Sequence, residues 1–122
     1  MAGKCTRDFY RNLSQEQQSY VQSFRTSYLL KKMIIKGTPW HYYDSENAGP
    51  TLLLLHGGFT DFSMWIHQII AFEKDFRVIA PTCPVLPQAT MKTYSGGLNR
   101  ILHSENAYPV FVMGYSEGGL IA

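Results

Sequence analysis

Residues 108–122 read Tyr-Pro-Val-Phe-Val-Met-Gly-Tyr-Ser-Glu-Gly-Gly-Leu-Ile-Ala, and this stretch decides the fold. An apolar run, residues 110–113, leads directly into the pattern G-x-S-x-G between Gly114 and Gly118. A strand, a sharp turn and the start of a helix form the context in which this pattern presents a nucleophilic serine. The sequence therefore makes Ser116 a candidate nucleophile. Gly114 and Gly118 are expected to leave room for the tight strand-to-helix crossing.

The rest of the chain is predicted to alternate strands and helices. Two short runs joined by Gly37-Thr38-Pro39 predict a β-hairpin, and a run with four leucines, Thr51–Leu55, predicts a strand buried on both faces. Apolar residues recur every three or four positions from Asp61, with Thr60 or Asp61 as the cap, and again after Thr90, which predicts two amphipathic helices. The expected elements are helices over 14–24, 61–72 and 90–102, and strands over 29–36, 40–44, 51–55, 76–80 and 108–113.

Gly96-Gly97 interrupts the last of these helices, where each glycine costs about 1 kcal/mol relative to alanine. Close packing of the helix on the sheet explains the pair best, and a local break is the alternative. The order of elements implies βαβ units on a parallel sheet. Ligands of such sheets bind beyond the carboxyl ends of the strands, where both glycine-rich corners are expected.

A serine nucleophile also requires N–H donors that stabilise the oxyanion of a tetrahedral intermediate. The turn supplies one, the backbone N–H of Glu117, at the N-terminus of its helix. The second is expected in the loop that follows the leucine-rich strand. There the N–H of Gly58 is the first candidate and that of Phe59 the second. Gly57 lets the backbone approach a ligand, and His56 is expected to brace the loop.

These motifs resemble the α/β-hydrolase superfamily: His56-Gly57-Gly58 matches its oxyanion loop, and Gly114 to Gly119 matches its nucleophile elbow. Residues 30–35, 40–44 and 76–81 are similar to the maspardin-like branch. The resemblance implies the N-terminal half of an α/β-hydrolase fold. That fold is a mostly parallel sheet that begins with a β-hairpin and carries helices on both faces. The implied strand order is 1-2-4-3-5, with strand 1 antiparallel.

By the same resemblance, the activity is that of a serine hydrolase that cleaves an ester, thioester or amide through an acyl-enzyme on Ser116. A serine at the elbow weighs against the dehalogenase and epoxide-hydrolase branches, which use Asp there. The expected partner is a small acyl substrate, with no cofactor and no metal. Residues 81–88 would lie near the pocket, and three of them are candidate substrate contacts: Pro84, Val85 and Leu86. The alternative is a non-catalytic binding or adaptor protein on the hydrolase scaffold, which the maspardin-like resemblance allows.

The family's catalytic triad continues from Ser to Asp or Glu and then to His in chain order. All four histidines of this chain, His41, His56, His67 and His103, precede Ser116. We therefore expect the 122-residue chain to be an inactive fragment, truncated after the elbow, whose acid and base lie beyond Ala122. His67 and His103 are expected on helix surfaces. Residues 1–28 are expected to form an N-terminal extension with a short helix, and 29–122 a partial core.

Composition fits a folded domain and excludes several classes of protein. Hydrophobic residues make up 45% and aromatic residues 14% of the chain, enough apolar material for a core. The net charge is only +2, and the scattered basic residues of the N-terminal third carry no nucleic-acid motif. No apolar run is long enough for a membrane span. Cys5 and Cys83 lack disulfide or zinc-ligand spacing, so a reducing, cytoplasmic location is expected.

Overall fold

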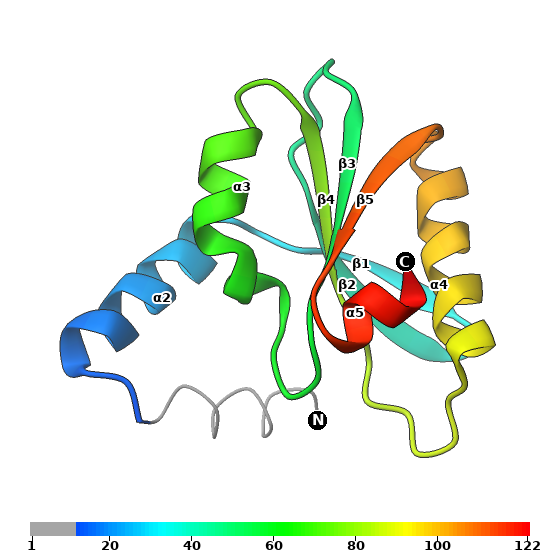
Figure 1. Ribbon diagram of the computed structural model, residues 1–122, viewed down its shortest axis with the longest axis horizontal. Coiled ribbons are helices and arrows are strands. Elements are labelled where there is room, and N and C mark those ends of the chain that lie inside the picture. Colours follow the sequence, from blue (N-terminus) through cyan, green and yellow to red (C-terminus); the bar gives the residue numbers. More distant parts are fainter. Residues whose placement is uncertain (1–11) are drawn as a thin grey trace.

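The computed structural model describes residues 12–122, so Cys5 and the basic residues before Asn12 lie outside the described part. One five-stranded sheet forms the centre of the molecule (Figure 1). Its strands are β1 (Lys31–Ile35), β2 (Thr38–Asp44), β3 (Thr51–Leu55), β4 (Arg77–Thr82) and β5 (Val110–Gly114). The helices are α2 (Gln15–Ser27), the 3₁₀ helix η1 (Phe62–Trp65), α3 (Ile66–Phe72), α4 (Met91–Ser104) and α5 (Glu117–Ile121).

The strand order is β1-β2-β4-β3-β5, which confirms the order that the resemblance implied. β3 pairs in parallel with both β4 and β5, whereas β2 is antiparallel to both of its neighbours, β1 and β4. The expectation that strand 1 is the antiparallel strand is therefore wrong: β1 runs in the same direction as β3, β4 and β5, and β2 runs against these four because the hairpin turn reverses the chain after β1. The carboxyl ends of β3, β4 and β5 consequently meet at one edge of the sheet, at the bottom of Figure 1.

Helices cover both faces of the sheet, as predicted. β3 is buried along its whole length, so its successive side chains enter two different cores. Leu52 and Leu54 pack with α2, η1 and α3 on one face. Leu53 and Leu55 pack with α4 on the other face, together with β2 and β4. A strand that is buried on both faces needs no alternation of polar and apolar residues, which is why a run of leucines serves here.

The helix starts follow local capping signals. Ser14 caps α2: its hydroxyl accepts from the Gln17 N–H, and the Gln17 side chain accepts from the Ser14 N–H, which completes a capping box. Asp61 rather than Thr60 caps the next helix, since its carboxylate accepts from the Ser63 N–H at 2.9 Å. That helix begins with the 3₁₀ turn η1 before it continues as α3. Thr90 caps α4 as predicted.

Of the two glycines in α4, Gly97 is the one that close packing requires. A Cβ on Gly97 would lie 2.2 Å from the Trp40 ring, whereas a Cβ on Gly96 would meet nothing within 4 Å. Residues 91–104 remain one continuous helix, so close packing is confirmed and the local break is excluded. Met91, which the helical period placed inward, is 46% exposed.

The hairpin turn is shorter than predicted. Lys36 and Gly37 have positive φ values of 49° and 78°, as in the two-residue turns that match strand twist, and Thr38 and Pro39 already belong to β2. Proline is tolerated there because β2 pairs with β4 only from His41 onward. On that side of Pro39 no backbone N–H is needed for hydrogen bonds to β4.

A buried ionic cluster ties β1, β2 and β4 to the end of α4. The Asp44 carboxylate, with 0% of its side chain exposed, accepts from Arg77 Nε at 3.0 Å and Nη2 at 2.6 Å. Glu105 accepts from Tyr42 at 2.6 Å, and Lys31 donates to Glu105 at 3.1 Å. Burial opposes ionisation of Asp44, but the hydrogen bonds from Arg77 and from the Glu46 N–H, together with the charge of Arg77, outweigh it and hold the pKa of this carboxyl below its usual value.

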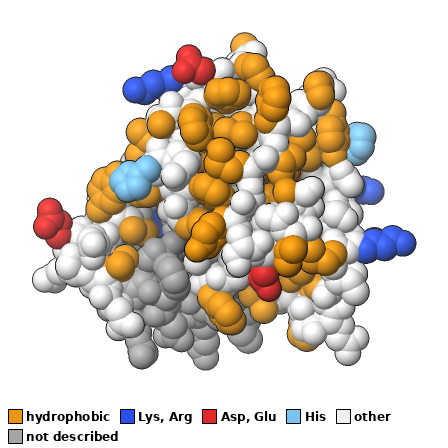
Figure 2. Space-filling model, viewed as in Figure 1, with side chains coloured by type: hydrophobic (Ala, Val, Ile, Leu, Met, Phe, Trp, Pro, Cys, Tyr) orange, Lys and Arg blue, Asp and Glu red, His pale blue; other side chains and the backbone are white. Residues whose placement is uncertain are grey.

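Hydrophobic side chains form a broad band over the middle of the face shown in Figure 2. β5 contributes to the exposed apolar surface, with Phe111 65%, Val112 43% and Met113 38% exposed. Within residues 12–122 this strand pairs only with β3, so its outer edge is open.

Candidate active site

The turn between β5 and α5 holds Ser116 in a rare backbone conformation. Ser116 has φ 54° and ψ −118°, and residues other than glycine seldom adopt such a positive φ. The turn is fixed on both sides: Tyr115 N–H donates to Leu55 O at 3.1 Å, and Gly118 N–H donates to Tyr115 O at 3.0 Å. The sequence G-x-S-x-G therefore forms a sharp, constrained corner at the carboxyl end of β5, with an exposed serine at its tip.

Both flanking glycines are required by contacts with the backbone. A Cβ on Gly114 would lie 2.4 Å from Gly118 O, and a Cβ on Gly118 would lie 2.2 Å from Leu55 O and 2.7 Å from His56 O. These oxygens belong to the crossing itself and to the end of β3. The corner consequently closes only when both positions lack a side chain.

The loop after β3 lies directly against this corner. A Cβ on Gly57 would be 3.1 Å from the Tyr115 ring and 3.5 Å from Ser116 Cβ. Phe59 has a positive φ of 62° and a side chain that is 78% exposed. The structure thus brings the loop from His56 to Phe59 together with Ser116, two segments that lie far apart in sequence.

His56 is the internal brace of that loop. Its Nε2 accepts from the Cys83 N–H at 2.9 Å, which assigns the ring proton to Nδ1, and Nδ1 lies 2.7 Å from Gly57 O. Thr60 also donates to Gly57 O, at 2.8 Å. Burial lowers the pKa of His56, so the ring is neutral. The side chain links the loop after β3 to the loop after β4.

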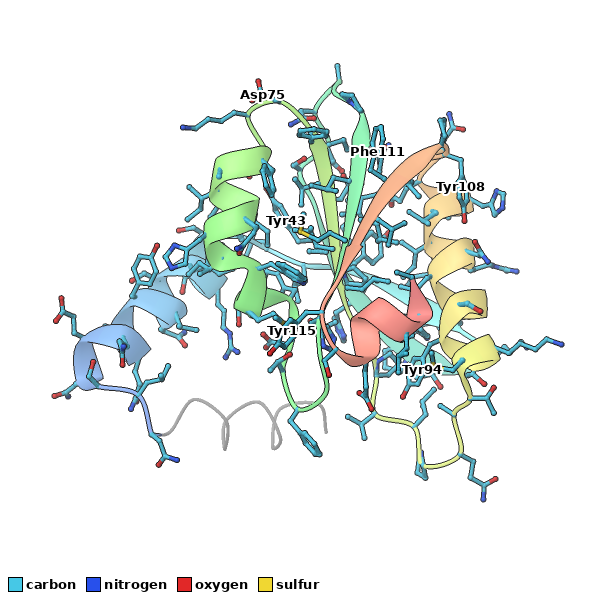
Figure 3. All side chains as sticks on the ribbon, viewed as in Figure 1. Tyr43, Asp75, Tyr94, Tyr108, Phe111 and Tyr115 are labelled. Carbon is cyan, nitrogen blue, oxygen red and sulfur yellow. The ribbon has the colours of Figure 1, made fainter. Side chains whose placement is uncertain are left out.

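A cavity of about 570 Å³ opens at the same edge of the sheet. Its walls are the loop 56–60, residues 82–85 after β4, the start of α4, and Glu117, Leu120 and Ile121 of α5. Ser116 lies next to the cavity and is not part of its lining. In Figure 3, Tyr115 lies beside the loop that follows β3, and Tyr94 lies at the start of α4.

Two of the three predicted substrate contacts line this cavity. Pro84 and Val85 do, whereas Leu86 lines a different groove, between the β1–β2 hairpin and α4. Leu86 therefore lies outside the lining of this cavity, and its role as a substrate contact stays a prediction. The Tyr94 hydroxyl donates to the Pro84 carbonyl at 3.1 Å, and Leu86 follows two residues later, just before the turn at 87–88.

Sequence reasoning missed several lining residues, among them Thr82, Cys83 and Tyr94. Thr82 and Cys83 stand at the carboxyl end of β4, so the rule that ligands bind beyond strand ends could have found them. Burial, together with the nearby charge of Glu117, raises the pKa of the Cys83 thiol to about 12. This thiol is therefore protonated and a poor nucleophile at neutral pH.

The other histidines are engaged at outer surfaces. His67 stacks on Tyr20 with ring centroids 6.0 Å apart, and His103 lies against Tyr108 at 4.8 Å. Both are exposed on helices, as predicted. In the described part of the chain, no group of three or more His, Cys, Asp or Glu residues is placed to hold a metal ion. Of the helices between residues 12 and 122, none has the length and apolar character needed to cross a membrane.

Comparison with solved structures relates this fold to hydrolases. A hydrolase from Pseudomonas aeruginosa PA01 matches with a TM-score of 0.70 and 23% identity, over 75% of this chain and 38% of its own. A provisionally named lipase from Acinetobacter baumannii AYE matches with a TM-score of 0.73 and 24% identity, over 91% of this chain and 41% of its own. An epoxide hydrolase from Vigna radiata matches with a TM-score of 0.68 and 22% identity, over 79% and 34%.

These similarities show that the chain has part of an α/β-hydrolase fold, and that it spans about two fifths or less of the length of these structures. No protein-family profile matches the sequence, and no curated protein matches it.

Proposed function

We propose that this chain is part of a serine hydrolase of the α/β-hydrolase superfamily, which cleaves an ester, thioester or amide through an acyl-enzyme on Ser116. The observation that carries the proposal is the positive φ of Ser116 at a corner that only glycines can flank. Such strain is costly and persists where a function requires it. An ordinary surface turn would not need a serine in this conformation.

The proposed chemistry uses the two segments that meet at the sheet edge. Ser116 Oγ attacks the acyl carbon while its proton passes to a general base. The oxyanion is stabilised by the backbone N–H of Glu117 and by that of Gly58 or Phe59. The bond to the leaving group breaks, the leaving group takes up the proton, and water hydrolyses the acyl-enzyme. His56 and Gly57 position the donors.

We propose that the acid and the base lie in the remainder of a longer protein, because the chain spans only 38%, 34% and 41% of the three structures compared above. The 122 residues alone are then inactive. We assign the protein to the maspardin-like branch on the similarity of residues 30–35, 40–44 and 76–81. A serine in place of Asp separates it from the epoxide hydrolases. A cytoplasmic location fits the free Cys83.

A non-catalytic binding protein on the same scaffold is the second candidate. One observation favours it: three histidines, His56, His67 and His103, are engaged in contacts away from the Ser116 hydroxyl. Binding would then use the cavity beside Ser116 without bond cleavage.

The test is turnover by the full-length protein that contains residues 1–122. Matched p-nitrophenyl esters, thioesters and anilides of short acyl chains are compared, with Ser116→Ala as the control. We expect hydrolysis of at least one class and a loss of roughly 10⁴-fold or more in Ser116→Ala. A folded protein that binds these compounds without turnover would favour the binding candidate.

A further inference from the structure

We propose that Glu117 makes the cavity beside Ser116 selective for charge, so that acyl compounds bearing an ammonium group bind best and those bearing a carboxylate bind worst. The inference rests on the proposed function and names the substrate class of that site. It concerns the part of the substrate that occupies the cavity.

The first argument is the position of the Glu117 carboxylate. Glu117 is the first residue of α5 and lines the cavity. Its Oε2 lies only 2.8 Å from the point where a Cβ on Gly58 would stand, so the exposed side chain leans over the loop after β3. A ligand that enters between this loop and α5 therefore meets the carboxylate.

The second argument is that nothing balances this charge. Glu117 has no ion-pair partner among residues 12–122, although the same part of the chain pairs Asp44 and Glu105 with Arg77. His56, the histidine of the lining, is neutral because burial lowers its pKa. Among residues 12–122, the lining consequently contributes one negative charge and no positive one.

The third argument is that the walls respond to this charge. The carboxylate raises the pKa of Cys83 and opposes the lowering of the pKa of His56, two groups that face the cavity from other elements. Its field therefore reaches across the space that a ligand would fill.

The remaining lining is mostly apolar and offers no competing anchor for a charged group. Val85, Met91 and Leu120 supply hydrocarbon surface, and the hydroxyl of Tyr94 is already bonded to Pro84 O. An acyl chain packs on the apolar walls, and its terminal group is attracted or repelled by the Glu117 carboxylate according to its charge. Because Glu117 is exposed, its interaction with a unit charge on the ligand at about 4 Å has the strength expected in water. That strength corresponds to a change of roughly fivefold in affinity.

The experiment measures dissociation constants of three matched, unreactive amides with the full-length protein by NMR titration at low salt. Hexanamide is neutral, 6-aminohexanamide is cationic, and adipic acid monoamide is anionic. We expect the cation to bind about fivefold more tightly than hexanamide and the anion about fivefold more weakly. Glu117→Gln should bring all three constants within about twofold, and Glu117→Asp should keep the order.

Glu16→Gln serves as the control, because it removes the same charge from the exposed first turn of α2 and should leave the order unchanged. Equal binding of the three amides by the wild-type protein would overturn the proposal, as would an unchanged order in Glu117→Gln or the absence of any binding. None of these amides needs to be cleaved, so a failure of the proposed hydrolysis is read separately from a failure of charge selectivity.

Discussion

Replacing Gly118 by alanine tests whether the corner at Ser116 is built as described. A Cβ there would stand 2.2 Å from Leu55 O, where ordinary contact begins near 3.4 Å, so β3 and α5 must separate by about 1 Å. Overpacking of this kind costs about 3 kcal/mol, and the better helix propensity of alanine returns about 1 kcal/mol. We expect Gly118→Ala to lower the free energy of unfolding of the full-length protein by about 2 kcal/mol and to displace Ser116.

Gly119→Ala is the matched control, because its Cβ would lie 3.6 Å from the nearest atom, Gly114 O. It should be neutral or stabilising by up to about 1 kcal/mol. Urea unfolding followed by circular dichroism measures both variants, and the expected gap between them is about 3 kcal/mol. Equal unfolding free energies for the two alanine variants would refute the packing at the corner.

Two further predictions concern the scaffold of the full-length protein. Gly97→Ala should lower the free energy of unfolding by about 2 kcal/mol and change the fluorescence of Trp40, because the added Cβ would touch the Trp40 ring. Gly96→Ala is the control and should be neutral or stabilising. Similar urea midpoints for the two variants would contradict the packing of α4. Asp44→Asn should cost about 3 kcal/mol at pH 7 because it removes the buried carboxylate that neutralises the guanidinium of Arg77. The pKa of Asp44 is lowered by folding, so its contribution is present above about pH 4 and is lost as the pH falls through the folded pKa. Unfolding curves from pH 7 to pH 2 should therefore converge for wild type and variant, and a constant gap would exclude the proposed ionisation.

Local signals in the sequence predicted the elements well. The cap at Ser14, the doubly buried run Thr51–Leu55 and the corner at Ser116 each have a signature within a few consecutive residues, which sequence patterns record directly. The strand order came from the resemblance to a known fold, and the structure confirms it. The boundaries shifted where tertiary pairing decided them, as at Pro39, which pairing with β1 brings into β2.

Contacts between distant segments could not be predicted in this way. The bond from Cys83 N–H to His56 joins residues 27 positions apart, and the Asp44–Arg77 pair joins residues 33 apart. The place of Leu86 is a further example, since only the folded path of the loop after β4 shows that it lines another groove. The lining of the cavity thus follows from the meeting of three strand ends, which no single stretch of sequence contains.

Labelling with a fluorophosphonate tests the central claim, the nucleophilicity of Ser116, most directly. The full-length protein is treated with a neutral alkyl fluorophosphonate, and the adduct is located by peptide mass spectrometry. We predict a single phosphonylated residue, Ser116, and no adduct in a folded Ser116→Ala variant. An unmodified Ser116 in folded protein, or equal labelling of wild type and variant, would contradict the account.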